Sequence, residues 1–185
     1  GEIWANNIKE VLLKNNLIDR PIHVISANMH SVMNSVFAHP LLSSKYKNKR
    51  SFDVFEDLSN SENKALREKV KKEALKSGMI DLPDTSGTNI DVQIFDTSKI
   101  DVSKIDIKAN AAILKEIKPV ILVMDYAFGE QAYETMDELL KPYKTENENI
   151  HLDVESVSIM GKAGILEGGK GDIMIPSAHI FEGTA

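Results

Sequence analysis

The chain has 185 residues, of which 42% are hydrophobic and 27% charged, as expected of a folded domain with one buried core. Its formal net charge of −6 argues against binding to nucleic acid or to an anionic membrane surface. The absence of cysteine excludes disulfides, thiolate chemistry and cysteine-based zinc sites.

The longest apolar run, 120–124, is far shorter than the roughly 20 residues that a membrane-spanning helix needs. The N-terminus also lacks the basic start and apolar core of a signal peptide. The cysteine-free composition fits a reducing cytoplasm, so we expect a cytoplasmic protein. The chain starts at Gly1 and stops soon after a predicted strand, so we expect 1–185 to be one α/β domain from the N-terminal part of a longer protein.

Residues 1–118 form a region that we cannot assign to a family from the sequence. Hydrophobic spacing and turn residues predict these elements in it: helix 3–17, strand 22–26, helix 28–42, helix 61–77, strand 92–95 and helix 109–117. The stretch 43–57, which is basic at its start, and the polar stretch 82–89 are predicted to be loops.

Residues 119–185 carry the clearest pattern in the chain. The continuous apolar run 120–124 is typical of a strand buried on both faces of a parallel sheet. A predicted helix at 130–141 and predicted strands at 155–160 and 172–175 follow. Alternating strands and helices predict a three-layer α/β/α domain with a mostly parallel central sheet.

Ligands of open α/β sheets bind beyond the carboxyl ends of the strands, so the loops after strands are candidate sites. The best candidate is the turn Gly161, Lys162, Ala163 and Gly164, because glycine lets the backbone approach a ligand closely and lysine adds a positive charge. The alternative is a tight turn in which glycine serves a positive φ and Lys162 lies in solvent.

Gly129 and Glu130 lie at a second strand-to-helix junction, where the amide groups of a helix N-terminus favour an anion. Glu130 can instead be a helix-starting residue that interacts favourably with the helix dipole.

At a third strand end, Asn28 and His30 are further candidates, with His30 able to act as an acid or base near neutral pH. In the alternative interpretation they only cap a helix. The histidines show no metal-ligand spacing, so no metal site is expected.

Four ordered segments of the last third resemble the nucleoside phosphorylase and nucleosidase superfamily, which includes AMP nucleosidases. They are the loop 127–131 with the helix segment 137–139, the turn 161–166, the strand 171–175 and the exit 182–184. This resemblance covers 119–185. It implies an α/β/α fold, self-association, no cofactor, and a nucleoside, nucleotide or other phosphate-bearing small molecule as ligand.

The resemblance implies cleavage of an N-glycosidic bond, with Gly129, Glu130 and the turn 161–164 lining the sugar or phosphate end of the ligand. Glu182 would lie near the base or sugar. The superfamily's phosphate-binding arginine is replaced here by Ile159, which favours hydrolysis, or binding without cleavage, over phosphorolysis. Its catalytic acids would follow Ala185, so the chain alone is expected to be inactive. The alternative is a non-catalytic nucleotide-binding or interaction domain of the same fold.

Overall fold

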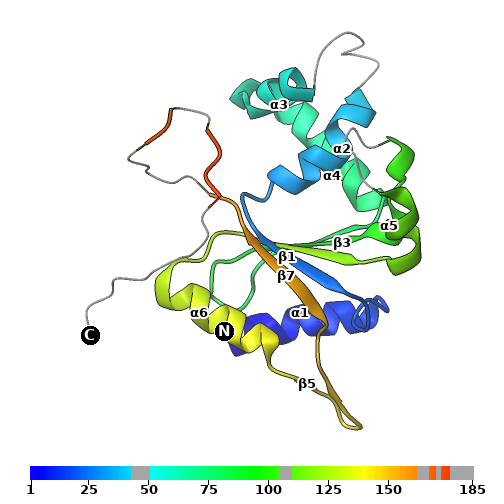
Figure 1. Ribbon diagram of the computed structural model, residues 1–185, viewed down its shortest axis with the longest axis vertical. Coiled ribbons are helices and arrows are strands. Elements are labelled where there is room, and N and C mark those ends of the chain that lie inside the picture. Colours follow the sequence, from blue (N-terminus) through cyan, green and yellow to red (C-terminus); the bar gives the residue numbers. More distant parts are fainter. Residues whose placement is uncertain (43–50, 105–109, 162–166, 170–171, 176–185) are drawn as a thin grey trace.

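The computed structural model describes residues 1–42, 51–104, 110–161, 167–169 and 172–175 (Figure 1). Within these residues the chain has an α/β fold with six α-helices and an open, five-stranded mixed sheet. Its helices are α1 (Glu2–Lys14), α2 (Ser31–Leu42), α3 (Ser51–Ser59), α4 (Lys64–Lys76), α5 (Ala111–Ile117) and α6 (Gly129–Leu140). Short 3-10 turns lie at Ser61–Asn63, Thr97–Lys99 and Val102–Lys104.

The strands of the main sheet are β1 (Ile22–Ser26), β2 (Met79–Leu82), β3 (Val92–Asp96), β4 (Val120–Met124) and β7 (Val154–Ile159). Their spatial order is β2-β3-β4-β1-β7. A separate hairpin joins β5 (Tyr143–Lys144) to β6 (Asn149–Ile150).

The sheet is mixed, which corrects the expectation of a mostly parallel one. β1 pairs in parallel with β4 and with β7, whereas β3 pairs antiparallel with β4 and with β2. The residues that join β2 to β3 form a loop without a helix, and such a connection suits antiparallel neighbours, because parallel ones need a crossover.

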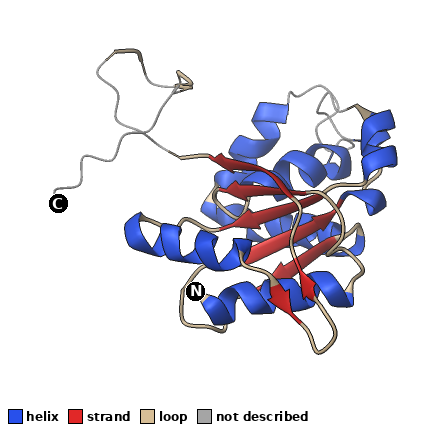
Figure 2. Ribbon diagram, turned by 60° about the horizontal axis from the view of Figure 1, so that its bottom comes forward, coloured by secondary structure: helices blue, strands red, loops and turns tan. Residues whose placement is uncertain are grey.

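Helices cover both faces of this sheet (Figure 2). Leu12 of α1 and Leu139 of α6 are buried with Leu122 on one face, and Phe37 of α2 is buried with Val123 on the other. Adjacent residues of β4 therefore point into different cores, which is why 120–124 is continuously apolar. Among the described residues, no helix is both long and apolar enough to span a membrane.

The structure contradicts two of the predicted elements and adds others. Residues 51–59 form α3 rather than a loop, because Val54 and Leu58 lie one helical turn apart and are buried at 0% and 2% exposure. Residues 172–175 form no strand, and Ile173 and Ile175 are each 88% exposed. The short strands β2, β5 and β6 were not predicted.

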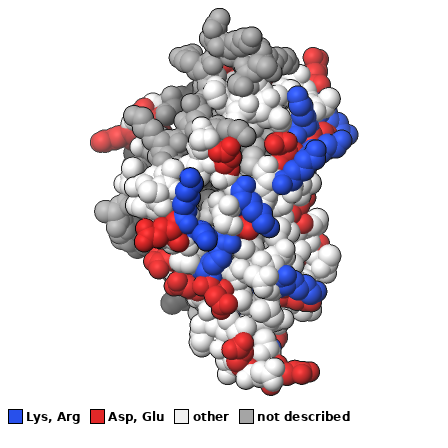
Figure 3. All heavy atoms as spheres, turned by 90° about the vertical axis from the view of Figure 1, so that its right-hand side faces the viewer, with Lys and Arg blue, Asp and Glu red and all other residues white. Residues whose placement is uncertain are grey.

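Charged groups of both signs are interspersed on the face of the molecule that Figure 3 shows. Neighbouring charges of opposite sign weaken each other's field, so this face carries no extended region of one sign. Over the described chain as a whole, ion pairs join Lys14 to Glu10 at 2.5 Å and Lys71 to Asp81 at 2.6 Å. These hydrogen-bonded pairs raise the pKa of both lysines.

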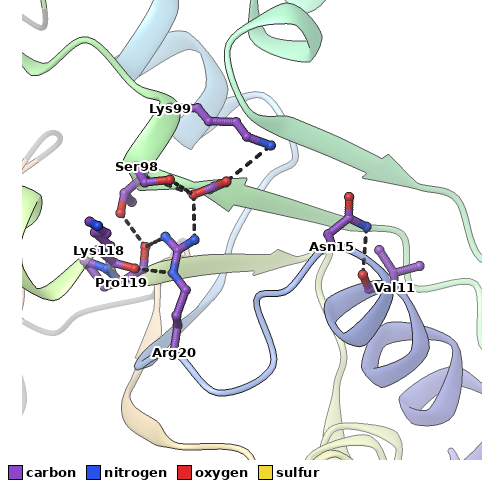
Figure 4. Close-up of polar contacts among 9 residues, drawn as sticks. Val11, Asn15, Arg20, Ser98, Lys99, Lys118 and Pro119 are labelled. Atoms are coloured by element: carbon purple, nitrogen blue, oxygen red, sulfur yellow. Dashed lines mark hydrogen bonds and ion pairs between the residues drawn. The ribbon is translucent and has the colours of Figure 1, made fainter.

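An ion pair between a buried aspartate and a partly buried arginine joins the end of β3 to the segment before β1 (Figure 4). Arg20 Nη1 lies 2.8 Å from Asp96 Oδ1, and Arg20 Nε donates a hydrogen bond to the backbone oxygen of Lys118. Both the backbone N–H and the hydroxyl of Ser98 also donate to Asp96. Burial alone would raise the pKa of Asp96, but the hydrogen bonds from Ser98 and Arg20 and the arginine charge lower it.

Replacing Arg20 with Met is expected to lower the free energy of unfolding near neutral pH by about 2 kcal/mol, because it leaves the buried carboxylate of Asp96 with only Ser98 and the exposed Lys99, 3.4 Å away, as partners. Since the folded-state pKa of Asp96 is depressed, its stabilisation is present above the unfolded pKa of about 4 and is lost as the pH falls through the folded value. Urea denaturation as a function of pH measures both effects. Lys14→Met removes an exposed pair and serves as the control, and equal stability losses in the two variants would contradict the prediction.

Candidate functional site

The two central parallel strands end next to each other, and the chain leaves them toward opposite faces of the sheet. After β1 it continues into α2 on one face, and after β4 it continues into α6 on the other. In open α/β sheets a ligand binds at such a topological switch point, outside the carboxyl ends of the strands. This edge of the sheet is therefore the expected location of a ligand site.

Backbone hydrogen bonds hold three strand ends together at this edge. The N–H of Ala27 donates to the oxygen of Met124 at 3.1 Å, and the N–H of Met160 donates to the oxygen of Ser26 at 2.9 Å. The ends of β1, β4 and β7 are consequently aligned, and the residues that follow them start from fixed positions.

The turn between β1 and α2 is built around Asn28. Its side-chain oxygen accepts a hydrogen bond from the N–H of His30 at 2.9 Å, and its backbone oxygen accepts one from the N–H of Ser31, also at 2.9 Å. An asparagine side chain that bonds two residues ahead in this way stabilises a turn. Asn28 thus shapes the loop, while His30 is exposed at the start of α2.

A cavity of about 350 Å³ opens beside this turn. It is bounded by the first two turns of α2, by α3 and by the residue after β7. The residues that line it are His30, Ser31, Asn34, Ser35, Phe55 and Met160. Its volume lies within the range of small-molecule sites.

The cavity offers hydrogen-bonding groups beside an apolar wall. Asn34 Oδ1 is buried and has no hydrogen-bond partner among the described residues, which is costly unless a ligand or water supplies a donor. The hydroxyl of Ser35 already donates to the backbone oxygen of Ser31 at 2.8 Å. Phe55 adds an aromatic side chain, and His30 is the one ionisable group among the described lining residues.

The other predicted site residues lie elsewhere or outside the described residues. Gly129, with φ +55°, and Glu130 begin α6, which packs on the opposite face, and both are exposed. Gly161 is exposed, and a Cβ placed on it would meet nothing within 4 Å. Residues Lys162, Ala163, Gly164 and Glu182 fall outside the described residues.

Four lining residues were not identified from the sequence: Asn34, Ser35, Phe55 and Met160. A usable signal existed for two of them, because Asn34 and Ser35 follow Ser31 by three and four positions on an otherwise apolar helix and so share one face with it. Phe55 carried no such signal, since its segment was predicted to be a loop. In the described part of the chain, no group of acidic or histidine side chains is arranged to hold a metal ion.

The loop between β2 and β3 reaches the same edge of the sheet, because Val92 at the start of β3 pairs with Met124 at the end of β4. Within this loop the carboxylate of Asp84 accepts hydrogen bonds from the N–H groups of Ser86 at 2.9 Å and Asn89 at 2.8 Å. Burial alone would raise the pKa of Asp84, but the hydroxyl and N–H of Ser86 and the N–H of Asn89 together lower it to about 2.

The fold and this edge define the chain as an open α/β domain with a small cavity beside a topological switch point. Comparison of its sequence with known families then shows that the chain belongs to a family of unknown function (DUF6909), whose pattern matches residues 53–184. No curated protein and no solved structure matches the chain.

This membership corrects the resemblance to the nucleoside phosphorylase and nucleosidase superfamily, for which there is no family match. The resemblance was built from short glycine-containing segments, which occur wherever an α/β chain turns after a strand. One of its four segments, the strand 171–175, is also not formed in the described residues 172–175.

Replacing Asp84 with Asn is expected to lower the free energy of unfolding near neutral pH by about 1 kcal/mol, a value reduced for solvent screening. Because the pKa of Asp84 is depressed to about 2, the stabilisation is present above the unfolded pKa and is lost as the pH falls toward 2. The stability difference between variant and wild type should therefore shrink in acid, as measured by urea denaturation. The exposed Glu130→Gln is the control, and a difference independent of pH would contradict the assignment.

Proposed function

We propose that this domain binds a small, neutral, ring-bearing molecule of nucleoside size in the cavity at the carboxyl ends of β1 and β7. The observation that carries the proposal is the buried oxygen of Asn34, which has no partner among the described residues, in a cavity of about 350 Å³ beside the carboxyl ends of β1 and β7. A ligand that donates a hydrogen bond to this oxygen would remove the cost of burying it unpaired.

The composition of the cavity supports a neutral ligand over a phosphate-bearing one. Its described lining residues include no lysine or arginine, the side chains that usually bind phosphate. Phe55 and Met160 instead supply soft, apolar contact for a planar ring, while the hydroxyl of Ser31 can bond to the polar groups of a sugar.

The same lining favours binding over cleavage of an N-glycosidic bond. Hydrolytic cleavage of a glycosidic bond ordinarily uses two ionisable groups, one to assist departure of the leaving group and one to activate water or to stabilise the sugar cation. Among the described lining residues His30 alone is ionisable. Binding without turnover is therefore the function that this geometry supports best.

Replacing Asn34 with Leu tests the proposal, because loss of this amide should weaken ligand binding without weakening the fold. The variant should fold with undiminished Tm, since it removes a buried oxygen that has no hydrogen-bond partner in the described part of the chain. Its affinity for a nucleoside should fall about tenfold, the equivalent of roughly 1.4 kcal/mol. Isothermal titration with adenosine, guanosine, cytidine and uridine measures this loss.

Gln93→Leu is the matched control. Gln93 Oε1 is also buried without a hydrogen-bond partner among the described residues, but Gln93 does not line the cavity. This variant should therefore bind nucleosides as the wild type does. Absence of nucleoside binding by the wild type, or equal affinity of wild type and Asn34→Leu, would refute the proposal. Chromatographic detection of free base would show that cleavage accompanies binding.

A further inference from the structure

The outer strand of the sheet, β7, leaves one edge and much of its surface open. It pairs with β1 on one side, and no described strand pairs with it on the other. Val157 and Ile159 are 49% and 77% exposed, and the adjoining Met160 is 52% exposed. Parallel strands are normally covered on both faces, and an open edge of this kind readily pairs with a further strand.

A short apolar segment follows β7 in the chain and is itself uncovered. Ile173 and Ile175 are each 88% exposed, and Met174 is 52% exposed. The segment begins at a turn in which the side chain of Asp172 accepts a hydrogen bond from the N–H of Gly169 at 2.7 Å. Exposure of consecutive large apolar side chains is unfavourable in water, so this segment is suited to burial against an apolar surface.

We propose that residues 172–175 bind along the open edge of β7 of the same chain as a sixth strand of the sheet. The alternation of side chains in the two segments would place their apolar residues on the same face of the sheet. Val157 pairs with Val24 and Ile159 with Ser26, so both exposed residues lie on the sheet face covered by α1 and α6. Ile173 and Ile175 share one face of an extended segment and would extend the same apolar surface.

The connection between the two strands permits this pairing within one chain. It runs from residue 160 to residue 171, about the dozen residues that a parallel crossover needs and more than an antiparallel hairpin needs. A short tether gives the segment of the same chain a high effective concentration at this edge. The chain's own segment is therefore favoured over the same segment of a second copy.

Disulfide trapping tests the pairing. The chain contains no cysteine, so no native thiol can compete with the introduced pair. Ser158 and Met174 would lie on the same face of neighbouring strands, the face opposite the two isoleucines. Adjacent strands are about 4.8 Å apart, within the span of a disulfide. The double variant Ser158→Cys with Met174→Cys should form an internal disulfide under mild oxidation, detected by mass spectrometry of the non-reduced peptides.

The control pair is Ser86→Cys with Met174→Cys, because Ser86 lies in the β2–β3 loop at the other end of the strand order. It should form no internal disulfide. If the Ser158 and Met174 variant forms no disulfide, or forms it only between two chains, the proposal is wrong.

A second measurement asks whether the segment is buried in solution. Ile173→Asp should lower Tm by about 5 °C if the side chain is buried beside β7, since the change would bury a carboxylate against apolar side chains. Ile3→Asp, at a residue of α1 that is 63% exposed, should leave Tm nearly unchanged. Equal Tm values for wild type and Ile173→Asp would overturn the proposal, and neither measurement depends on nucleoside binding.

Discussion

The structure depends on the parallel pairing of β1 with strands on both sides. β1 lies between β4 and β7 and is the one strand of the main sheet with two parallel neighbours. Its residues Ile22 and Val24 are fully buried, so the pairing is supported by packing as well as by backbone hydrogen bonds. Because a strand and its parallel neighbour end at the same edge, this pairing brings three chain exits together there. The cavity beside α2 and the open edge at β7 both follow from this arrangement.

Some buried polar groups of the domain have hydrogen-bond partners among the described residues, and others do not. Lys9 is 1% exposed, and its Nζ donates to the backbone oxygens of Glu138 and Lys141 at 2.7 Å each, which ties α1 to the end of α6. Burial lowers the pKa of Lys9, although the nearby Glu138 acts in the opposite direction. Asp96 is likewise fully bonded. Asn34 Oδ1 and Gln93 Oε1 differ, because neither buried oxygen has a hydrogen-bond partner among the described residues, and of these two residues Asn34 is the one that lines the cavity beside α2.

Several elements could be predicted from the sequence because their signals are local. The apolar run at β4, the helix at α1 and the loop at 82–89 each have a local signal. The structure confirms the strand, confirms the helix with bounds Glu2–Lys14 in place of 3–17, and confirms the loop except at Leu82, which ends β2. The mixed direction of the sheet could not be predicted in this way, because strand pairing depends on contacts between residues far apart in the chain. The family resemblance failed for a related reason. Short glycine-containing segments indicate turns, and turns are shared by many unrelated families.

The sequence by itself determined an α/β domain with candidate positions after its strands, including Asn28 and His30. Only the tertiary structure decided that Phe55 of α3 and Met160 after β7 complete one cavity with His30, while Gly129 and Glu130 belong to the opposite layer. The reason is physical. Local periodicity defines which face of a helix is apolar, but the order of strands and the layer that receives each helix are set by packing across the whole sheet.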